Sequence, residues 1–254
     1  MNITKVKKSV KDFYEKFVDE YEITRFGSLK DHIANVVQLQ TVSQIVRSKK
    51  AYVSLDAPCG TGRITRILIP NSQMTIALDI NVMMLNRTRT KIGSSYPIEF
   101  IRGDIEYLPF RNDSFNVTTS FRIMWHVDNP KKSLSELIRV TKPDGFLIFD
   151  IMNRYSLFSF WCAVFKNRLN VPTKPSDLRE IVDFLISNGM KIKKIIGVRS
   201  PLIQLFPSKT SKSPQKLAKL IYFLEKIRKP KFLCSLCTQT MIYTRKAKVL
   251  ESML

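Results

Sequence analysis

The sequence has no long hydrophobic run, no secretory signal and no internal repeat. A membrane-spanning helix needs about 18 or more consecutive apolar residues, and no such run occurs in the 254 residues. The first eight residues lack the apolar segment of a signal peptide, and no repeat of roughly twenty to fifty residues indicates a solenoid. We therefore expect a globular, cytoplasmic protein that does not span a membrane.

Metal-binding residues are also scarce, with four cysteines and two histidines. Cys234 and Cys237 form a single C-x-x-C pair, whereas a zinc ribbon needs a second pair or nearby histidines. His32 and His126 are far from this pair in the sequence. We expect cysteines that pack in the core or in strands, and no metal site.

The sequence has few acidic residues: it contains 42 Lys and Arg but only 21 Asp and Glu, which gives a net charge of +21. From Lys191 onward, fifteen basic residues face only Glu225 and Glu251, so this quarter carries +13. Such a field favours polyanions, either nucleic acid or an anionic membrane surface. A surface that is merely well solvated is the alternative.

The length and the 44% hydrophobic content suit one α/β domain with additions. Apolar and β-branched runs alternate with helical patterns, which is typical of a parallel sheet covered by helices on both faces. The predicted strands are residues 51–56, 74–79, 98–101, 115–120, 145–151, 191–198 and 238–244. The predicted helices are residues 6–23, 30–46, a helix from residue 62, 81–92, 131–141 and 176–188.

Two additions interrupt this alternation. Residues 1–50 form a helical N-terminal extension before the domain of residues 51–254, and residues 201–233 are an insertion before the last strand. We expect that last strand to be an antiparallel edge strand. In the turn of residues 142–145, Pro143 sets φ and Gly145 supplies the reversal into the next strand.

A glycine loop follows the first predicted strand. Gly60 and Gly62 lack Cβ atoms, so the backbone after Asp56 can approach a ligand closely. Ligands of open α/β sheets bind at the carboxyl ends of strands. There Asp79, which ends the second strand, could accept hydrogen bonds from two ribose hydroxyls, which excludes a 2′-phosphate. Thr65 replaces the third glycine of a nicotinamide-binding loop and argues against a dehydrogenase.

Asp104 follows the third strand and could accept from an exocyclic adenine amine while Ile105 packs on the ring. For each of these aspartates taken singly, a turn or a helix cap is the alternative.

Residues 55–63, 77–80 and 103–110 resemble, in order and spacing, the first three motifs of class I S-adenosylmethionine-dependent methyltransferases. Residues 121–127 and 134–145 extend the similarity to the branch that contains quinone-biosynthesis C-methyltransferases and many small-molecule enzymes. The resemblance covers residues 53–150. It implies a Rossmann-like, mostly parallel seven-stranded sheet with an N-terminal helical lid and a helical insertion before the last strand.

The same resemblance implies roles for individual residues. Asp56 and Gly60 would hold the methionine end of S-adenosylmethionine, Asp79 the ribose, and Asp104 with Ile105 the adenine, while Phe121 would line the sulfonium side. Pro58 stands where glycine is commoner. The expected cofactor-binding set is Asp56, Ala57, Pro58, Gly60, Gly62, Asp79, Ile80, Asp104, Ile105 and Phe121.

The methyl acceptor is less defined. His126, in the loop after the fourth strand, could act as the base that removes a proton, and a histidine that only hydrogen bonds within the loop is the alternative. Further candidates for the acceptor pocket are Tyr14, Tyr21, Arg122 and Trp125. No Asn-Pro-Pro-Tyr or Asp-Pro-Pro-Tyr motif follows the fourth strand, which argues against adenine-N6 or glutamine methylation and favours C- or O-methylation.

Residues 215–229 predict a basic amphipathic helix, which could pack on the domain, dock on anionic lipid or bind RNA. Three functions stay open: a methyltransferase of small-molecule or lipid-like acceptors, which we favour, an RNA methyltransferase, and a non-catalytic S-adenosylmethionine-binding protein. The favoured function would place the protein in the cytoplasm, with peripheral contact to an anionic membrane as an option.

Overall fold

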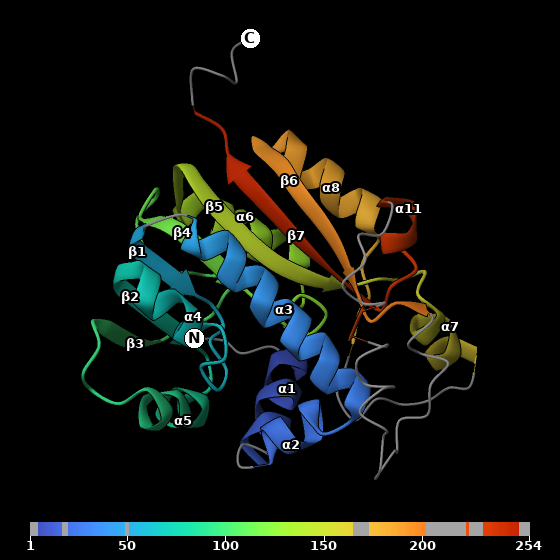
Figure 1. Cartoon of the computed structure of the whole chain (residues 1–254), viewed down its shortest axis with the longest axis horizontal. Coiled ribbons are helices and arrows are strands. Elements are labelled where there is room, and N and C mark those ends of the chain that lie inside the picture. Colours follow the sequence, from blue (N-terminus) through green and yellow to red (C-terminus); the bar gives the residue numbers. More distant parts are fainter. Residues whose placement is uncertain are drawn as a thin grey trace.

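A computed structural model describes residues 5–16, 20–48, 51–164, 173–201, 222–223 and 231–248. Its centre is a seven-stranded sheet in the order β3-β2-β1-β4-β5-β7-β6 (Figure 1). The strands from β3 to β5 pair in parallel, and β7 pairs antiparallel with both β5 and β6. The predicted mostly parallel seven-stranded α/β fold is therefore confirmed. The strand order reverses between β1 and β4, where open sheets of this type bind ligands.

The strands lie close to the predicted runs. They are β1 (Ala51–Asp56), β2 (Ser72–Asp79), β3 (Ile98–Arg102), β4 (Phe115–Ser120), β5 (Thr141–Met152), β6 (Met190–Val198) and β7 (Gln239–Lys246). The helices are α1 (Lys5–Lys16), α2 (Tyr21–Phe26), α3 (Leu29–Arg47), α4 (Thr65–Leu68), α5 (Val82–Ile92), α6 (Pro130–Val140), α7 (Leu157–Val164), α8 (Leu178–Ser187) and α11 (Lys231–Cys234), with a 3₁₀ turn at Ile69–Asn71.

Side-chain caps begin several helices where polar residues precede apolar ones. Asn81, Asn129 and Asp177 accept hydrogen bonds from backbone N–H groups in the first turns of α5, α6 and α8. The prediction of one helix over residues 6–23 is wrong, because α1 ends at Lys16 and α2 begins at Tyr21. Helix α4 begins at Thr65 rather than at Gly62, whose φ of 79° does not fit a right-handed helix.

Helices cover both faces of the sheet. Along β5, Leu147, Phe149 and Ile151 join the core under α6 and α8, whereas Ile148 points to the opposite face, under α3 and α4. This alternation follows from the two-residue period of a strand. Both faces are apolar because both are covered.

Two local predictions need correction. Strand β7 is antiparallel but does not lie at an edge, since β6 pairs along its other side; residues 239–244 are all buried, as expected for an inner strand. Residues 142–145, predicted as a turn, lie within β5 where its pairing with β4 is irregular, and the positive φ of 64° there belongs to Asp144, not to Gly145. Gly145 is needed for space, because a Cβ atom there would lie 2.8 Å from the Lys142 carbonyl oxygen.

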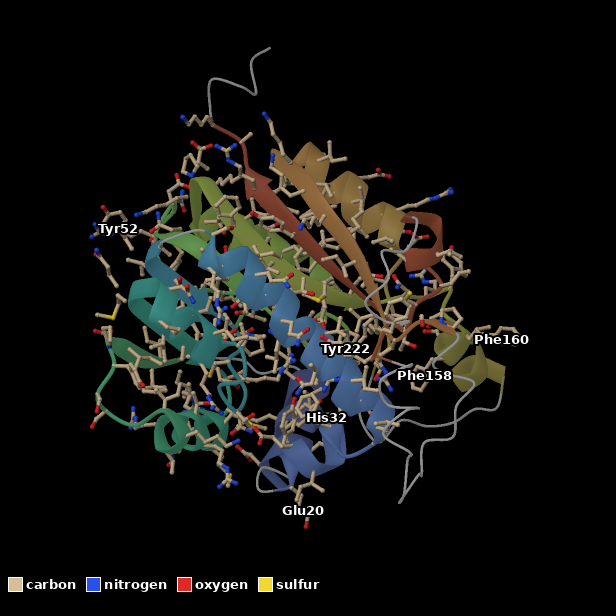
Figure 2. The ribbon with its side chains drawn as sticks, in the orientation of Figure 1. Glu20, His32, Tyr52, Phe158, Phe160 and Tyr222 are labelled. Atoms are coloured by element: carbon tan, nitrogen blue, oxygen red, sulfur yellow. The ribbon has the colours of Figure 1, made fainter. Side chains whose placement is uncertain are left out.

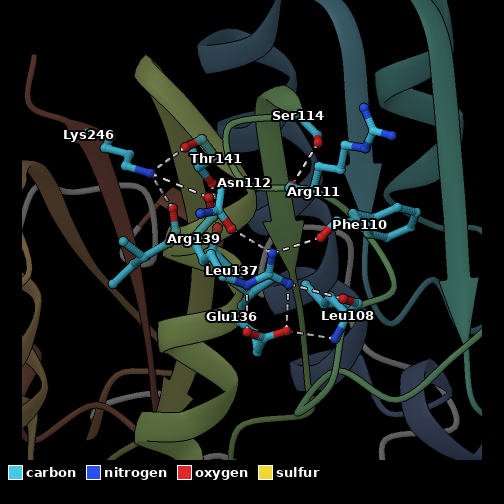
Figure 3. Close-up of polar contacts among 11 residues, drawn as sticks. Leu108, Phe110, Arg111, Asn112, Ser114, Glu136, Leu137, Arg139, Thr141 and Lys246 are labelled. Atoms are coloured by element: carbon cyan, nitrogen blue, oxygen red, sulfur yellow. Dashed lines mark hydrogen bonds and ion pairs between the residues drawn. The ribbon is translucent and has the colours of Figure 1, made fainter.

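A hydrogen-bond network around Arg139 ties the loop after β3 to α6 (Figure 3). The Arg139 guanidinium donates to the carbonyl oxygens of Leu108 and Phe110 and pairs with Glu136, which in turn accepts from the Leu108 backbone N–H. Hydrogen bonds to charged groups are stronger than neutral ones. The network therefore fixes the loop that begins at Asp104.

Most of the insertion of residues 201–233, including the predicted basic helix, lies outside the described residues. Within it, the Tyr222 hydroxyl donates to Gln40 Oε1 at 2.5 Å, and its ring packs against Ile33 and Val37 of α3 (Figure 2). Helix α7, which was not predicted, carries Phe160 at the outer edge of the view, 63% exposed (Figure 2). In the described part of the chain, no helix has the length and apolar character to cross a membrane.

Candidate functional site

A cavity opens beside the carboxyl ends of β1, β2 and β4, with α1 and α2 on its other side. It encloses about 1050 Å³ of empty space, its open mouth included. Eleven of the predicted site residues line it: Tyr14, Tyr21, Pro58, Gly60, Asp79, Ile80, Asp104, Ile105, Phe121, Arg122 and His126. The other four, Asp56, Ala57, Gly62 and Trp125, do not line it.

The glycine loop is held against β2 and α5. The Gly60 backbone N–H donates to Asp79 Oδ2 at 2.9 Å, and its carbonyl accepts from the Thr88 hydroxyl at 2.7 Å. Both Gly60 and Gly62 have positive φ. An added Cβ at Gly60 would meet nothing within 4 Å, whereas one at Gly62 would lie 2.7 Å from Thr88. Gly60 therefore leaves space at the cavity wall, and Gly62 allows the loop to pack on α5.

Asp79 is buried at the end of β2. Its Oδ1 accepts from the Asn81 backbone N–H at 2.9 Å, in addition to the bond from Gly60 to Oδ2. Burial raises the pKa of Asp79 to about 6, although these backbone donors act against the rise. At neutral pH this carboxylate is ionised and faces the cavity, where it can accept further hydrogen bonds.

Asp56 lies behind the cavity wall rather than on it. Its oxygens accept from the hydroxyls of Thr65 and Thr119 at 2.6 and 2.9 Å, and burial raises its pKa to about 6. These bonds join β1 to α4 and β4. Thr65, the residue that stands where a dehydrogenase loop has glycine, thus has a structural task that the sequence did not reveal.

Lys7 of α1 contacts the residues expected at the adenine end. Its Nζ lies 2.5 Å from Asp104 Oδ2 and also pairs with Glu106. Burial alone would lower the pKa of Lys7, but the hydrogen bonds to Asp104 and Glu106 raise it above its ordinary value. Sequence reasoning missed Lys7, because nothing local links two residues 97 positions apart.

His126 meets the N-terminal helices at the opposite part of the cavity. The Tyr14 hydroxyl oxygen lies 3.2 Å from His126 Nε2 and accepts from Arg25 Nη2 at 2.8 Å. Burial raises the pKa of Tyr14 well above its ordinary value, so this phenol is neutral at physiological pH. Trp125 is buried beside His126, with ring centroids 5.8 Å apart, and supports the histidine from behind.

The cysteines take structural positions. Cys59, Cys234 and Cys237 are buried, and a Cβ at Gly197 would lie 2.5 Å from the Cys237 sulfur. Among the residues that the structure describes, no group of three or more His, Cys, Asp or Glu side chains could hold a metal ion.

Known proteins share this architecture. A protein of Methanocaldococcus jannaschii is 29% identical over 226 residues, 87% of this chain and 91% of that protein. The ubiquinone/menaquinone biosynthesis C-methyltransferase of Wigglesworthia glossinidia brevipalpis is 36% identical over 124 residues, which are 42% of this chain and 49% of that enzyme. The crystal structure of magnesium protoporphyrin IX methyltransferase from Synechocystis PCC 6803 with bound SAH matches with a TM-score of 0.65 at 13% identity, covering 95% of this chain and 100% of that chain.

The sequence profile of the family described as methyltransferase domain matches residues 55–149, which contain the end of β1, all of β2, β3 and β4, most of β5, and the whole glycine loop. The chain is a class I S-adenosylmethionine-dependent methyltransferase. This methyltransferase uses S-adenosylmethionine as its cofactor. The profile ends before α7 and begins after α3, so the N-terminal helices that line the cavity lie outside it.

The cavity of the methyltransferase fits this cofactor in three respects. Ile80 and Ile105 provide apolar walls, and the open space at Gly60 admits a ligand against the backbone. Asn81 also lines the cavity, and its buried Nδ2 has no hydrogen-bond partner within the described residues. Since buried donors are normally satisfied, this amide is available to a bound molecule.

Proposed function

We propose that the cavity holds S-adenosylmethionine between the glycine loop and the loop after β3. Asp79 would accept hydrogen bonds from the ribose, Asp104 would accept from the adenine amine beside Ile105, and Phe121 would line the sulfonium side. The ionised, buried carboxylate of Asp79 supports this arrangement, because it faces the cavity with both oxygens fixed by backbone donors. If Asp104 binds the adenine amine, then Lys7 either keeps its ion pair with Asp104 while the cofactor is bound or gives up that ion pair.

The acceptor would be a small or lipid-like molecule, methylated on carbon or oxygen. The quinone C-methyltransferase relative acts on such a molecule, and the acceptor side of this cavity is largely aromatic, with Tyr14, Tyr21 and Phe121 on its walls. We propose that α1 and α2 form a lid over this side. The observation that carries the proposal is the pairing of Tyr14 with His126 inside the same cavity as Asp79.

When bound, the cofactor supplies an activated methyl group. The protein must align the acceptor with it and accept the proton that the acceptor loses. We propose that His126 accepts this proton as a neutral imidazole and becomes an imidazolium. The Tyr14 oxygen accepts from Arg25 Nη2 and lies 3.2 Å from His126 Nε2, and this contact fixes the imidazole at the cavity wall.

Incubation with methyl-labelled S-adenosylmethionine and extracted quinone precursors or other small molecules tests this proposal. We expect the label in an organic-soluble product, and His126→Gln should abolish its formation while the protein still binds S-adenosylhomocysteine. His32→Gln is the matched control, because it makes the same change at an exposed histidine of α3 that does not line the cavity. Label that enters RNA alone would contradict a small-molecule acceptor.

Contact with a membrane depends on the predicted basic helix of residues 215–229. If the acceptor is membrane-resident, the substitution of Lys216, Lys219 and Lys226 by Glu should reduce flotation with anionic liposomes and leave cofactor binding intact, because each basic residue contributes about 1 kcal/mol at an anionic surface. If the parent protein does not float with anionic liposomes, this helix only packs on the domain, as Tyr222 packs on α3.

A further inference from the structure

Two arginines line the cavity near its aromatic end. Arg63 follows the glycine loop directly, and Arg122 follows β4 and Phe121. Their guanidinium carbons lie 5.4 and 4.7 Å from the centroid of the same ring, Phe26 of α2. The fold thus brings two positive charges together on the cavity wall, although the residues are 59 positions apart in the sequence.

Among the residues that the structure describes, neither guanidinium forms an ion pair with a carboxylate. Arg63 Nη1 donates to the neutral side chains of Asn35 and Gln38, at 2.6 and 3.1 Å. Arg122 Nε and Nη1 are buried and have no hydrogen-bond partner within the described residues. Buried donors, and those of charged groups above all, are almost always paired in native proteins.

The carboxylate nearest to this pair is already engaged. Asp150 accepts from the Arg122 backbone N–H at 2.6 Å through one oxygen, and from the Gln38 amide at 3.0 Å through the other. Burial, and then the like charge of Arg122, lower the pKa of Arg63 to about 10, against the opposing effect of Asp150. Asp56 opposes the lowering as well, but the hydrogen bonds of Asp56 and Asp150 go to hydroxyl, amide and backbone groups rather than to the two guanidiniums.

The backbone at Arg122 is held in an unusual conformation. Its φ of 61° is rare for a residue with a side chain, and the bond from its N–H to Asp150 maintains it. Such backbone strain concentrates at ligand sites, because the surrounding structure must keep it in place. Here it aims the guanidinium into the cavity rather than along the sheet.

We propose that Arg63 and Arg122 form a binding site for a carboxylate group inside the cavity. Guanidinium groups match the planar shape of a carboxylate with several N–H donors. A bound carboxylate would give the buried Arg122 Nε and Nη1 atoms the hydrogen-bond partner that they lack among the described residues. A doubly charged phosphate fits less well, because Asp56 and Asp150 lie close by.

Two bound molecules can bring a carboxylate here: the acceptor, or the cofactor through its amino-acid end. The acceptor is favoured, because Arg122 lies close to the Tyr14–His126 pair. Burial chiefly raises the pKa of Tyr14, and the positive charges of Arg25 and Arg122 both act against that rise. This inference rests on the proposed function, since it takes the cavity as the place where cofactor and acceptor meet.

Calorimetry on the full chain separates these sources. The first comparison is between the affinities for S-adenosylhomocysteine and for methylthioadenosine, which lacks the amino-acid carboxylate. The second is between the affinities for benzoate and for its neutral analogue benzyl alcohol, each measured on the protein with and without S-adenosylhomocysteine. The variants are Arg63→Gln, Arg122→Gln and Arg122→Lys, which keeps the charge. Arg66→Gln is the matched control, because it removes an exposed arginine of α4, three residues after Arg63.

We expect benzoate to bind the parent at least tenfold more tightly than benzyl alcohol. Both Gln variants should lose this preference, Arg122→Lys should keep part of it, and Arg66→Gln should keep all of it. If the variants instead weaken S-adenosylhomocysteine tenfold but leave methylthioadenosine unchanged, the carboxylate site stands and belongs to the cofactor. A parent protein that discriminates neither pair of ligands overturns the inference, whatever the variants do. Failure of the parent to bind S-adenosylhomocysteine at all would overturn the proposed function separately.

Discussion

The substitution Asp79→Asn tests the cofactor site where its geometry is best defined. The change keeps the size of the side chain but removes the charge, and it turns an amide NH₂ toward one of two backbone donors, Gly60 or Asn81. A hydrogen bond to a charged group is worth about 1.5–3 kcal/mol. We therefore expect S-adenosylhomocysteine to bind about 10- to 150-fold more weakly, since each factor of ten is about 1.4 kcal/mol.

Isothermal titration at pH 7.5 measures this difference directly. Asp113→Asn is the matched control, because that carboxylate is exposed, does not line the cavity, and pairs with Lys246 at the end of β7. We expect the control to bind like the parent. Equal affinity of the parent and Asp79→Asn would refute the role of Asp79 at the ribose.

The pH dependence adds a second readout on the same residue. Burial raises the pKa of Asp79 to about 6 in the folded protein, from an ordinary value of 3.8. The affinity for S-adenosylhomocysteine should therefore fall as the pH drops below about 6 in the parent, and stay flat in Asp79→Asn. The contribution of Asp79 to the free energy of unfolding changes with pH in the opposite direction from the ligand affinity. The folded state binds the proton more tightly than the unfolded state, so the contribution of Asp79 decreases as the pH rises from about 4 to about 6 and is constant above that.

Two further perturbations follow from the same geometry. His126→Gln should lower kcat by about 100- to 10,000-fold, the usual contribution of a general base, while titration should show an unchanged affinity for S-adenosylhomocysteine. Tyr14→Phe should lower kcat less than His126→Gln does. If kcat is unchanged in His126→Gln, the histidine has only a structural role. Gly62→Ala should lower the Tm more than Gly60→Ala. An alanine at either position would cost about 1–2 kcal/mol of stability because φ is positive, but only the Cβ at residue 62 would also clash with Thr88. Thermal unfolding of the two variants measures the difference, and equal Tm values would contradict the prediction.

The sequence predicted the elements whose signals are local. β1 and β4 have the predicted bounds, because a run of apolar or β-branched residues ends at a turn residue in each case. The start of α5 was predicted within a residue, since Asn81 caps it in the way that its sequence position suggests. The residues that line the cavity from these strand ends were predicted for the same reason.

The remainder depends on contacts between distant segments. No local pattern indicates that β7 lies between β5 and β6, because hydropathy marks a strand as buried without naming its neighbours. Asp56 was expected at the ligand, yet Thr65 and Thr119 bind both of its oxygens behind the wall. The contact of Lys7 with Asp104 depends on how α1 docks, which is a property of the whole fold.

The division of the site between two parts of the chain bears on specificity. The segment that matches the methyltransferase family, residues 55–149, supplies Asp79 and the glycine loop, which concern the cofactor. Helices α1 and α2 supply Lys7, Tyr14 and Phe26, and these contact Asp104, His126 and the two arginines respectively. A cofactor that a whole family shares can be bound by residues common to the family, whereas each acceptor needs a pocket with residues of its own. Because Tyr14 and Phe26 contact His126 and the two arginines, which the proposed acceptor would use, the choice of acceptor should depend on residues outside the segment shared with the family as well as on residues inside it.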